Sequence, residues 1–301
     1  MTNSTFIALR RLVGVILKER LGTNCMDLIF FDLDGTLLNK SSEISSFTKE
    51  TLGLLGERDI AFTVATGRTM HSAQFVLQGQ SFVLPHIYNN GVAIWDPAGN
   101  ALTLENLLAP SEVNLIIEHA VNNNITPFIN TVNMDSPDHE HVIYHSSPKH
   151  QVEHDLIEKY FSRTKARLAS IESLPANAHI TNISMIGDAP LVYDMYKQLN
   201  MHGGLIAYSG PAIEGDEYRW MDVHHNLANK GSAVELLRQQ LNASNVIVFG
   251  DSDNDLSMFK LADEAYAPSN AKPYIKDAAT SVIGHHDEDG IARFLRERFS
   301  L

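Results

Sequence analysis

The sequence predicts an α/β protein with a Rossmann-like parallel-sheet core and an inserted α+β domain. Three short apolar runs (residues 28–31, 60–65 and 245–249) have the composition of strands that are buried on both faces of a parallel sheet. Each run ends abruptly in a polar turn, and a helical pattern at 46–58 separates the first two runs. Strand, helix and strand at this spacing form a right-handed βαβ unit, which places the polar turns at one edge of the sheet.

The same alternation returns near the end of the chain. A helix is predicted at 230–241, before the strand at 245–249, and the acidic turn after that strand opens another helix at residue 256. A strand at 264–267 and a helix at 289–298 complete the predicted core.

The middle of the chain lacks strict βαβ repetition. Helical segments alternate there with half-exposed strands, which is typical of a separate α+β domain. The helices are expected at 109–123, 150–162 and 190–199, and the strands at 125–130, 142–145, 181–186 and 205–208. We therefore expect the core to comprise residues 26–91 and 213–301, and an inserted cap-like domain to comprise residues 92–212. The hinges between them are expected at Gly91 and at 210–218, and residues 1–25 are expected to form a separate extension.

The extension at 1–25 is basic, and its apolar residues recur at helical spacing, which predicts a short amphipathic helix. The apolar residues are too few and too often interrupted to cross a bilayer, and no small-residue cleavage pattern follows them. Two interpretations stay open: a surface-anchoring or targeting helix, or a segment that merely precedes the globular protein. The second is favoured because Met26 stands directly before the first buried strand.

Composition narrows the class of protein. The 301 residues include 23 Lys and Arg against 36 Asp and Glu, a formal net charge of −13. This balance argues against nucleic-acid partners and anionic membranes, whose binding sites are basic, but it leaves room for a small anion held by a few cations or a metal. The single cysteine, Cys25, excludes an intrachain disulfide and a cysteine zinc cluster, and it favours a cytoplasmic location.

Two carboxylates, Asp32 and Asp34, stand beside Gly35 directly after the first buried strand. Like charges so close together are costly to bury unless a cation neutralises them, and Mg²⁺ suits a site with few protein carboxylates. An aspartate in this place can also act as a nucleophile, and a second carboxylate two residues on is in reach as general acid and base. An Asp-rich surface turn is the alternative for this motif taken singly.

Two further segments carry phosphate-binding chemistry. Thr66, Gly67 and Arg68 end the second strand with a hydroxyl, an unobstructed backbone amide and a guanidinium. Lys230 begins a predicted helix, where its ammonium suits an oxyanion or a nucleophilic carboxylate. Taken alone, each is explained equally well by a surface turn or a solvated lysine.

The acidic turn at 251–255 contributes Asp251 as a candidate metal ligand and Asn254 as a donor to a phosphate oxygen. It is not a calcium loop, because Leu256 stands where that loop needs Gly and Ala262 where it needs Glu. Four polar turns in this order favour a common site for a metal and a phosphate.

Together these motifs resemble those of the haloacid dehalogenase (HAD) superfamily of phosphohydrolases. They read Phe-Asp32-Leu-Asp34-Gly-Thr36-Leu-Leu, Ala-Thr66-Gly67-Arg68, Asn-Lys230-Gly231 and Gly250-Asp251-Ser-Asp-Asn254-Asp255. The large insertion between the second and third motifs, with Asn90-Gly91 at its entrance, is similar to the Cof-type subfamily (IIB) and its α/β cap. The resemblance extends from Met26 to the end of the chain. It departs in two loops, where the usual glycine before Lys230 is missing and Val92 replaces alanine.

The resemblance implies a Mg²⁺-dependent phosphatase that hydrolyses small phosphorylated metabolites, such as sugar phosphates, through an aspartyl phosphate. It implies Asp32 as the nucleophile and Asp34 as the general acid and base. The implied metal ligands are Asp32, the backbone carbonyl of Asp34, Asp251 and, in the outer shell, Asp255. The implied substrate-binding groups are the backbone of Leu33, Thr66, Gly67, Arg68, Lys230 and Asn254. The inserted domain is expected to close over the site and to select the leaving group.

Two alternatives stay open: a phosphomutase or phosphotransferase that shares the aspartyl-phosphate step, and a non-enzymatic sugar-phosphate-binding regulator. The expected assembly is a monomer or a homodimer. Five histidines of the inserted domain are interpreted as surface or substrate-facing residues rather than as zinc ligands. They are His139, His141, His145, His150 and His154.

Overall fold

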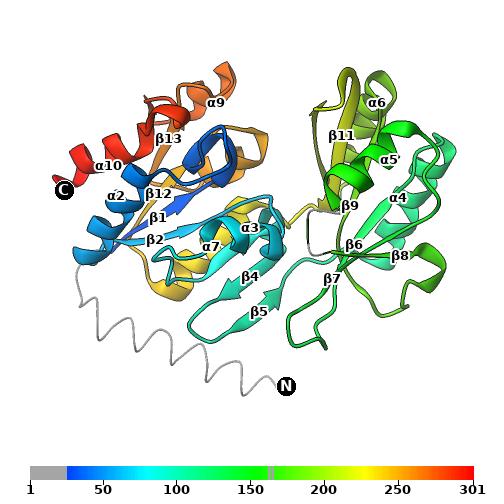
Figure 1. Cartoon of the computed structure of the whole chain (residues 1–301), viewed down its shortest axis with the longest axis horizontal. Coiled ribbons are helices and arrows are strands. Elements are labelled where there is room, and N and C mark those ends of the chain that lie inside the picture. Colours follow the sequence, from blue (N-terminus) through cyan, green and yellow to red (C-terminus); the bar gives the residue numbers. More distant parts are fainter. Residues whose placement is uncertain (1–25, 162–163, 165) are drawn as a thin grey trace. The chain divides into compact units, whose positions relative to one another are not determined.

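The computed structural model describes residues 26–161, 164 and 166–301, so the predicted helix at 1–25 lies outside the described residues. The chain divides into two compact units (Figure 1). Among the described residues, unit 1 comprises 26–68, 73–101 and 229–301, and unit 2 comprises 69–72 and 102–228.

Unit 1 is built on a five-stranded parallel sheet in the order β14-β13-β12-β1-β2. Its strands are β1 (Asp27–Phe31), β2 (Ala61–Val64), β12 (Asn245–Phe249), β13 (Glu264–Pro268) and β14 (Ser281–Ile283). The predicted fold class is thus confirmed: β1 lies between β2 and β12, the strands that follow α2 and α7 along the chain.

Helices cover both faces of this sheet, which explains why its strands are apolar without alternation (Figure 1). On one face, Phe294 of α10 packs against Phe249 and Tyr266. Helix α10 (Gly290–Phe299) also contacts α2 (Ser46–Glu57), which begins where the Ser45 side chain accepts a hydrogen bond from the backbone of Thr48.

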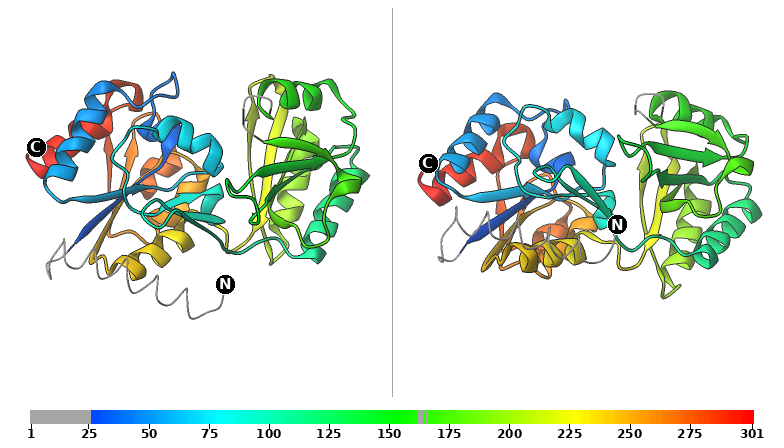
Figure 2. Two further views of the ribbon diagram at one scale, coloured as in Figure 1. Left: turned by 60° about the horizontal axis from the view of Figure 1, so that its bottom comes forward. Right: turned by 90° about the horizontal axis from the view of Figure 1, so that it is seen from below.

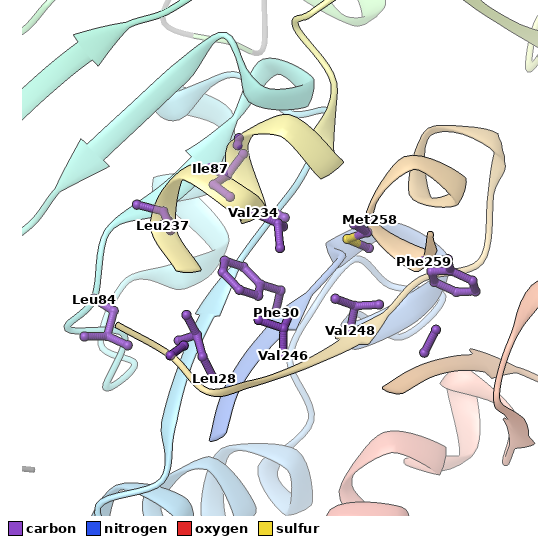
Figure 3. Packing of buried hydrophobic residues seen from close by; sticks show 14 of the residues in the cluster. Leu28, Phe30, Leu84, Ile87, Val234, Leu237, Val246, Val248, Met258 and Phe259 are labelled. Carbon is purple, nitrogen blue, oxygen red and sulfur yellow. The ribbon is translucent and has the colours of Figure 1, made fainter. Parts of the chain in front are cut away.

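The other face is covered by α7 (Lys230–Leu241), α8 (Leu256–Phe259) and α9 (Pro273–Ala278). Figure 3 shows Phe30 and Val246 of the sheet close to Val234 of α7, with Met258 of α8 nearby. Burial of each large apolar side chain contributes about 1.5–3 kcal/mol. This core fixes the depth at which α7, and therefore its first residue, meets the sheet.

A small second sheet follows α3 (Met70–Leu77). It has the order β3-β4-β5, with β3 (His86–Tyr88), β4 (Ala93–Asp96) and β5 (Ala101–Leu104). A parallel bridge between Ala65 and Ile87 sets β3 beside the end of β2. These strands, of only three or four residues each, were not predicted from the sequence.

Unit 2 contains a six-stranded, mostly antiparallel sheet in the order β10-β11-β9-β6-β7-β8 (Figure 2). Its strands are β6 (Phe128–Val132), β7 (His141–His145), β8 (Arg167–Ser170), β9 (His179–Asp188), β10 (Leu205–Ala212) and β11 (Gly215–His225). The helices are α4 (Pro110–Asn122), α5 (Gln151–Lys159) and α6 (Ala189–Asn200). Ile116 of α4, Met195 of α6, and Ile183 and Met185 of β9 share one apolar core.

The structure differs from the expected boundaries at the second hinge. Residues 210–218 form the tip of the β10–β11 hairpin, and β11 belongs to unit 2, where it pairs with β9 and β10. The expected start of the core at 213 therefore lies inside unit 2, and unit 1 resumes at Asn229. The polar beginning of β11 carries no apolar alternation, so pairing with its neighbours rather than sequence pattern makes it a strand. In the described part of the chain, every helix is too short or too polar to cross a membrane.

Candidate active site

The polar turns of unit 1 meet at the carboxyl edge of its parallel sheet. Backbone hydrogen bonds run from the N–H of Asp32 to the carbonyl of Phe249 (2.9 Å) and from the N–H of Ala65 to the carbonyl of Phe31 (2.9 Å). These bonds extend the strand pairing of β12, β1 and β2 to the point where each strand ends. The residues that follow the three strands are thereby held side by side.

The turn after β1 folds onto the turn after β12. Gly35 has a φ of 72°, and a Cβ added to it would lie 2.5 Å from Oδ2 of Asp251, so a larger residue there would be strained and would displace this carboxylate. Thr36 donates from Oγ1 to Oδ1 of Asp251 at 3.2 Å. The first acidic motif thus positions the carboxylate of the last one.

Three carboxylates converge at this edge. Oxygens of Asp32, Asp251 and Asp255 all lie within 4.8 Å of one another, and they form the one such cluster of three or more acidic, His or Cys ligands found in the described residues. Lys230, which is fully buried, donates from Nζ to Oδ1 of Asp32 at 2.5 Å and to Oδ1 of Asp255 at 2.6 Å. Lys230 is therefore a buried counter-ion rather than the solvated lysine that its position at a helix start suggested.

Asp255 also organises its own loop. Its Oδ2 accepts hydrogen bonds from the backbone N–H groups of Asp251 and Ser252, both at 2.9 Å. With Oδ1 bound to Lys230, both oxygens of this buried carboxylate are engaged. The outer-shell role of Asp255 toward a metal stays a prediction.

The electrostatic balance of the cluster favours a cation. Three carboxylates against one ammonium leave an excess of two negative charges in a largely buried place. Burial raises the pKa of Asp32 well above its usual range, although the Lys230 ammonium opposes this. Burial and the neighbouring Asp255 raise the pKa of Asp251 to about 6. Burial works to lower the pKa of Lys230, but Asp255 and Asp32 outweigh it and raise that pKa.

This donor set fits a hard divalent cation. All three groups offer carboxylate oxygens, the ligands that Mg²⁺ prefers, and their excess of two negative charges matches the charge of the ion. A bound cation would also lower the pKa values of Asp32 and Asp251, which burial raises, and so would keep both carboxylates ionised.

Asp34 does not belong to this cluster. Both oxygens of its carboxylate accept hydrogen bonds from Arg68, at 2.7 Å from Nε and 2.6 Å from Nη2. The pair is bidentate, and the Asp34 side chain is 56% exposed. Arg68 therefore contacts the expected general acid, and its predicted role near the substrate stays a prediction.

The remaining expected binding groups surround the same edge. Thr66 is buried, and its Oγ1 accepts a hydrogen bond from the N–H of Arg68 (3.1 Å). A Cβ added to Gly67 would lie 3.5 Å from Nδ2 of Asn254, so these two expected groups are neighbours. Leu33 buries its side chain completely in the turn that follows Asp32, which leaves its backbone at the edge.

Two site residues received no role from the sequence. Thr36 stands in the quoted aspartate motif and bonds to Asp251. Asn90 follows β3 and bonds to Asn254 across 164 residues. The signal that could have found Asn90 is the Asn-Gly pair at the entrance of the insertion, since Asn and Gly favour left-handed turns.

The histidines of unit 2 do not gather into a metal cluster among the described residues. His145 and His150 contact backbone carbonyls of Ser146 and Asn124. His141 is not a surface residue: it is 5% exposed, and its Nε2 lies 3.0 Å from Oδ1 of Asn130. Burial lowers the pKa of His141 to about 4. The alternative of a substrate-facing histidine stays a prediction.

Comparison with known proteins shows the family of this chain. The profile of the haloacid dehalogenase-like hydrolase family matches residues 29–295, so the chain belongs to that family of enzymes. Among named relatives, the 5-amino-6-(5-phospho-D-ribitylamino)uracil phosphatase YwtE of Bacillus subtilis is 26% identical over 91% of this chain and 99% of its own.

Solved structures share the fold. A haloacid dehalogenase-like hydrolase from Bacteroides thetaiotaomicron is 24% identical, with a TM-score of 0.70 over 91% of this chain and 99% of its own. The HAD subclass IIB sugar phosphatase BT4131 is 20% identical, with a TM-score of 0.72 over 91% of this chain and 99% of its own.

Proposed function

We propose that this protein is a Mg²⁺-dependent phosphatase that hydrolyses small phosphomonoesters through an aspartyl phosphate on Asp32. The observation that carries the proposal is the convergence of Asp32, Asp251, Asp255 and Lys230 at one edge of the parallel sheet. Phosphoryl transfer depends mainly on positioning and on charge neutralisation, and this edge offers groups for both.

Asp32 is the nucleophile. Lys230 holds its Oδ1, which fixes the rotation of the carboxylate and so the direction of Oδ2. A bond forms between an Asp32 oxygen and phosphorus while the bond from phosphorus to the leaving oxygen breaks. Water then attacks the phosphorus of the acyl phosphate and releases inorganic phosphate and the free carboxylate.

Asp34 transfers the protons in this proposal. It gives a proton to the leaving oxygen and later takes one from the attacking water. Because both oxygens of Asp34 accept hydrogen bonds from Arg68, this role requires the pair to open during the reaction. The exposure of the Asp34 side chain leaves room for that movement.

Asp32, Asp251 and the backbone carbonyl of Asp34 hold Mg²⁺, and Asp255 supports them through Lys230 and the loop amides. When bound, the ion neutralises charge on the phosphoryl oxygens. Thr66, Gly67, Lys230, Asn254 and the backbone of Leu33 bind those oxygens, and Arg68 adds positive charge nearby.

The proposed substrate class is that of small phosphorylated metabolites. YwtE and YitU of Bacillus subtilis are named for a phosphoribitylamino-uracil, and BT4131 is named a sugar phosphatase. A phosphoribityl compound and hexose phosphates are therefore the first compounds to assay. We propose that unit 2 selects the leaving group and that the enzyme works in the cytoplasm, for which the single cysteine is the support.

Phosphate release from a panel of phosphomonoesters, with Mg²⁺ and with EDTA, tests the proposal. Asp32→Asn should abolish release, because an amide oxygen is a poor nucleophile. Asp253→Asn is the matched control, since Asp253 lies in the same acidic loop but contacts Lys272 and Tyr274 at 2.7 Å, and it should keep wild-type activity. Full activity in Asp32→Asn, or phosphate release that EDTA does not change, would contradict the proposal. If the protein converts a sugar phosphate to its isomer without releasing free phosphate, it is a mutase rather than a phosphatase.

A further inference from the structure

A left-handed turn follows β3 at the edge that carries the proposed active site. Asn89, Asn90 and Gly91 have φ values of 49°, 55° and 104°, and all three residues are buried. Asn and Gly adopt this conformation more readily than other residues do. Three such residues in a row persist where surrounding contacts enforce the conformation, and such turns concentrate at functional sites.

The backbone of this turn joins two segments of the proposed phosphate site. The N–H groups of Asn89 and Asn90 donate to the carbonyls of Arg68 (2.9 Å) and Thr66 (3.0 Å). Gly91 packs against the backbone of Asn229, the residue before Lys230, so closely that an added Cβ would lie 2.5 Å from the Asn229 oxygen. The turn therefore sets the spacing between the second motif and the start of α7.

The Asn90 side chain reaches the fourth motif. Its Oδ1 accepts a hydrogen bond from Nδ2 of Asn254 at 2.9 Å, while Oδ1 of Asn254 accepts one from Oγ of Ser252 at 2.7 Å. A planar carboxamide that is held at both ends has one orientation. Because Nδ2 carries two hydrogens in this plane, fixing one of them fixes the direction of the other.

We propose that Asn90 is a positioning residue for phosphoryl binding: it aims the second N–H of Asn254 at a phosphoryl oxygen beside Gly67. A Cβ added to Gly67 would lie 3.2 Å from Oδ1 of Asn90, so the backbone of the second motif comes close to the same amide pair. This inference rests on the proposed phosphatase function, and it gives a role to a residue outside the metal cluster.

Asn90→Gly is the test variant, because glycine accepts the φ of 55° and removes the side-chain carboxamide that accepts from Asn254. Asn100→Gly is the matched control, an exposed Asn with a φ of 47°. We expect Asn90→Gly to lower kcat/KM by about 10- to 100-fold and to weaken inhibition by inorganic phosphate, as misplaced binding groups do. Asn100→Gly should leave both unchanged.

A double-mutant cycle with Asn254→Ala separates positioning from a general structural effect. If Asn90 acts through Asn254, the double variant is no worse than Asn254→Ala alone. Additive losses, or wild-type kinetics in Asn90→Gly, overturn the inference.

If Asn90→Gly fails to fold, Asn90→Asp decides, because Asp also tolerates the left-handed conformation and keeps the acceptor. Its added negative charge should weaken inhibition by inorganic phosphate at least about tenfold, as expected for a charge within reach of the anion. Unchanged inhibition overturns the inference. If the wild-type protein releases no phosphate from any monoester, the proposed function is overturned as well. If the wild-type protein is active but the losses in the two single variants add up in the double variant, only the inference about Asn90 is overturned.

Discussion

Lys230→Ala removes an ammonium that is fully buried 2.5 Å from Asp32 and 2.6 Å from Asp255. Removing one partner of a buried ion pair costs about 3–5 kcal/mol, because the other charge stays desolvated. We expect the free energy of unfolding, measured by urea denaturation in EDTA at pH 8, to fall by this amount. That loss is a large part of the 5–15 kcal/mol that is typical of a folded protein.

The deficit should shrink as the pH falls from 8 to 5. Burial already raises the pKa of Asp32, and loss of Lys230 removes the charge that opposes this rise. The folded variant then binds more protons than its unfolded chain in this window, so its stability increases as the pH falls. Lys272→Ala is the control: its Nζ lies 2.7 Å from Asp253, but both side chains are about half exposed, and the pair should contribute about 1 kcal/mol or less. Equal losses in the two variants, or a Lys230→Ala deficit independent of pH, would refute this reasoning.

Three further predictions concern the metal, the turn after β3 and a buried histidine. Asp251→Asn should raise the Mg²⁺ concentration for half-maximal activity by at least about tenfold, and Asp253→Asn should not; equal Mg²⁺ requirements would argue against Asp251 as a ligand. Gly91→Ala should lower the free energy of unfolding, measured by urea denaturation, by several kcal/mol, because the added Cβ would meet the backbone of Asn229. Gly79→Ala is the control: its φ is 79° and nothing lies within 4 Å of an added Cβ, so it should cost only about 1–2 kcal/mol of backbone strain. Similar losses in the two variants would show that the contact with Asn229 is unimportant. Burial lowers the pKa of His86 to about 4, so at this residue the unfolded chain binds a proton below pH 6.5 that the folded chain does not bind until about pH 4. His86 should therefore contribute about 3 kcal/mol to the fall in the free energy of unfolding between pH 6.5 and 4. In His86→Asn the fall should be smaller by about this amount, and an unchanged pH dependence would contradict the assignment.

The strands that build the core could be predicted because they are buried on both faces. Runs such as 28–31 and 246–249 are uniformly apolar, and the polar residues that follow them mark the sheet edge where the site lies. The fold class and the family of hydrolases follow from these runs and from the motifs that end them.

Other features depend on contacts between distant segments, so the sequence could not show them. Lys230 is buried because Asp32 and Asp255 meet it from two other parts of the chain. The pairing of Arg68 with Asp34 and that of Asn90 with Asn254 are likewise tertiary contacts. Strand β11 escaped prediction because its polar start lacks alternation.

Chemical trapping of the phosphorylated enzyme tests the central claim most directly. The wild-type protein is mixed with Mg²⁺ and a phosphomonoester that it hydrolyses, quenched in acid within milliseconds, reduced with borohydride and mapped by peptide mass spectrometry. Borohydride converts an aspartyl phosphate to homoserine, and we expect homoserine at position 32 and unmodified aspartate at position 34. Free phosphate that accumulates while every aspartate remains unmodified, or a modification at a residue other than Asp32, would contradict the account.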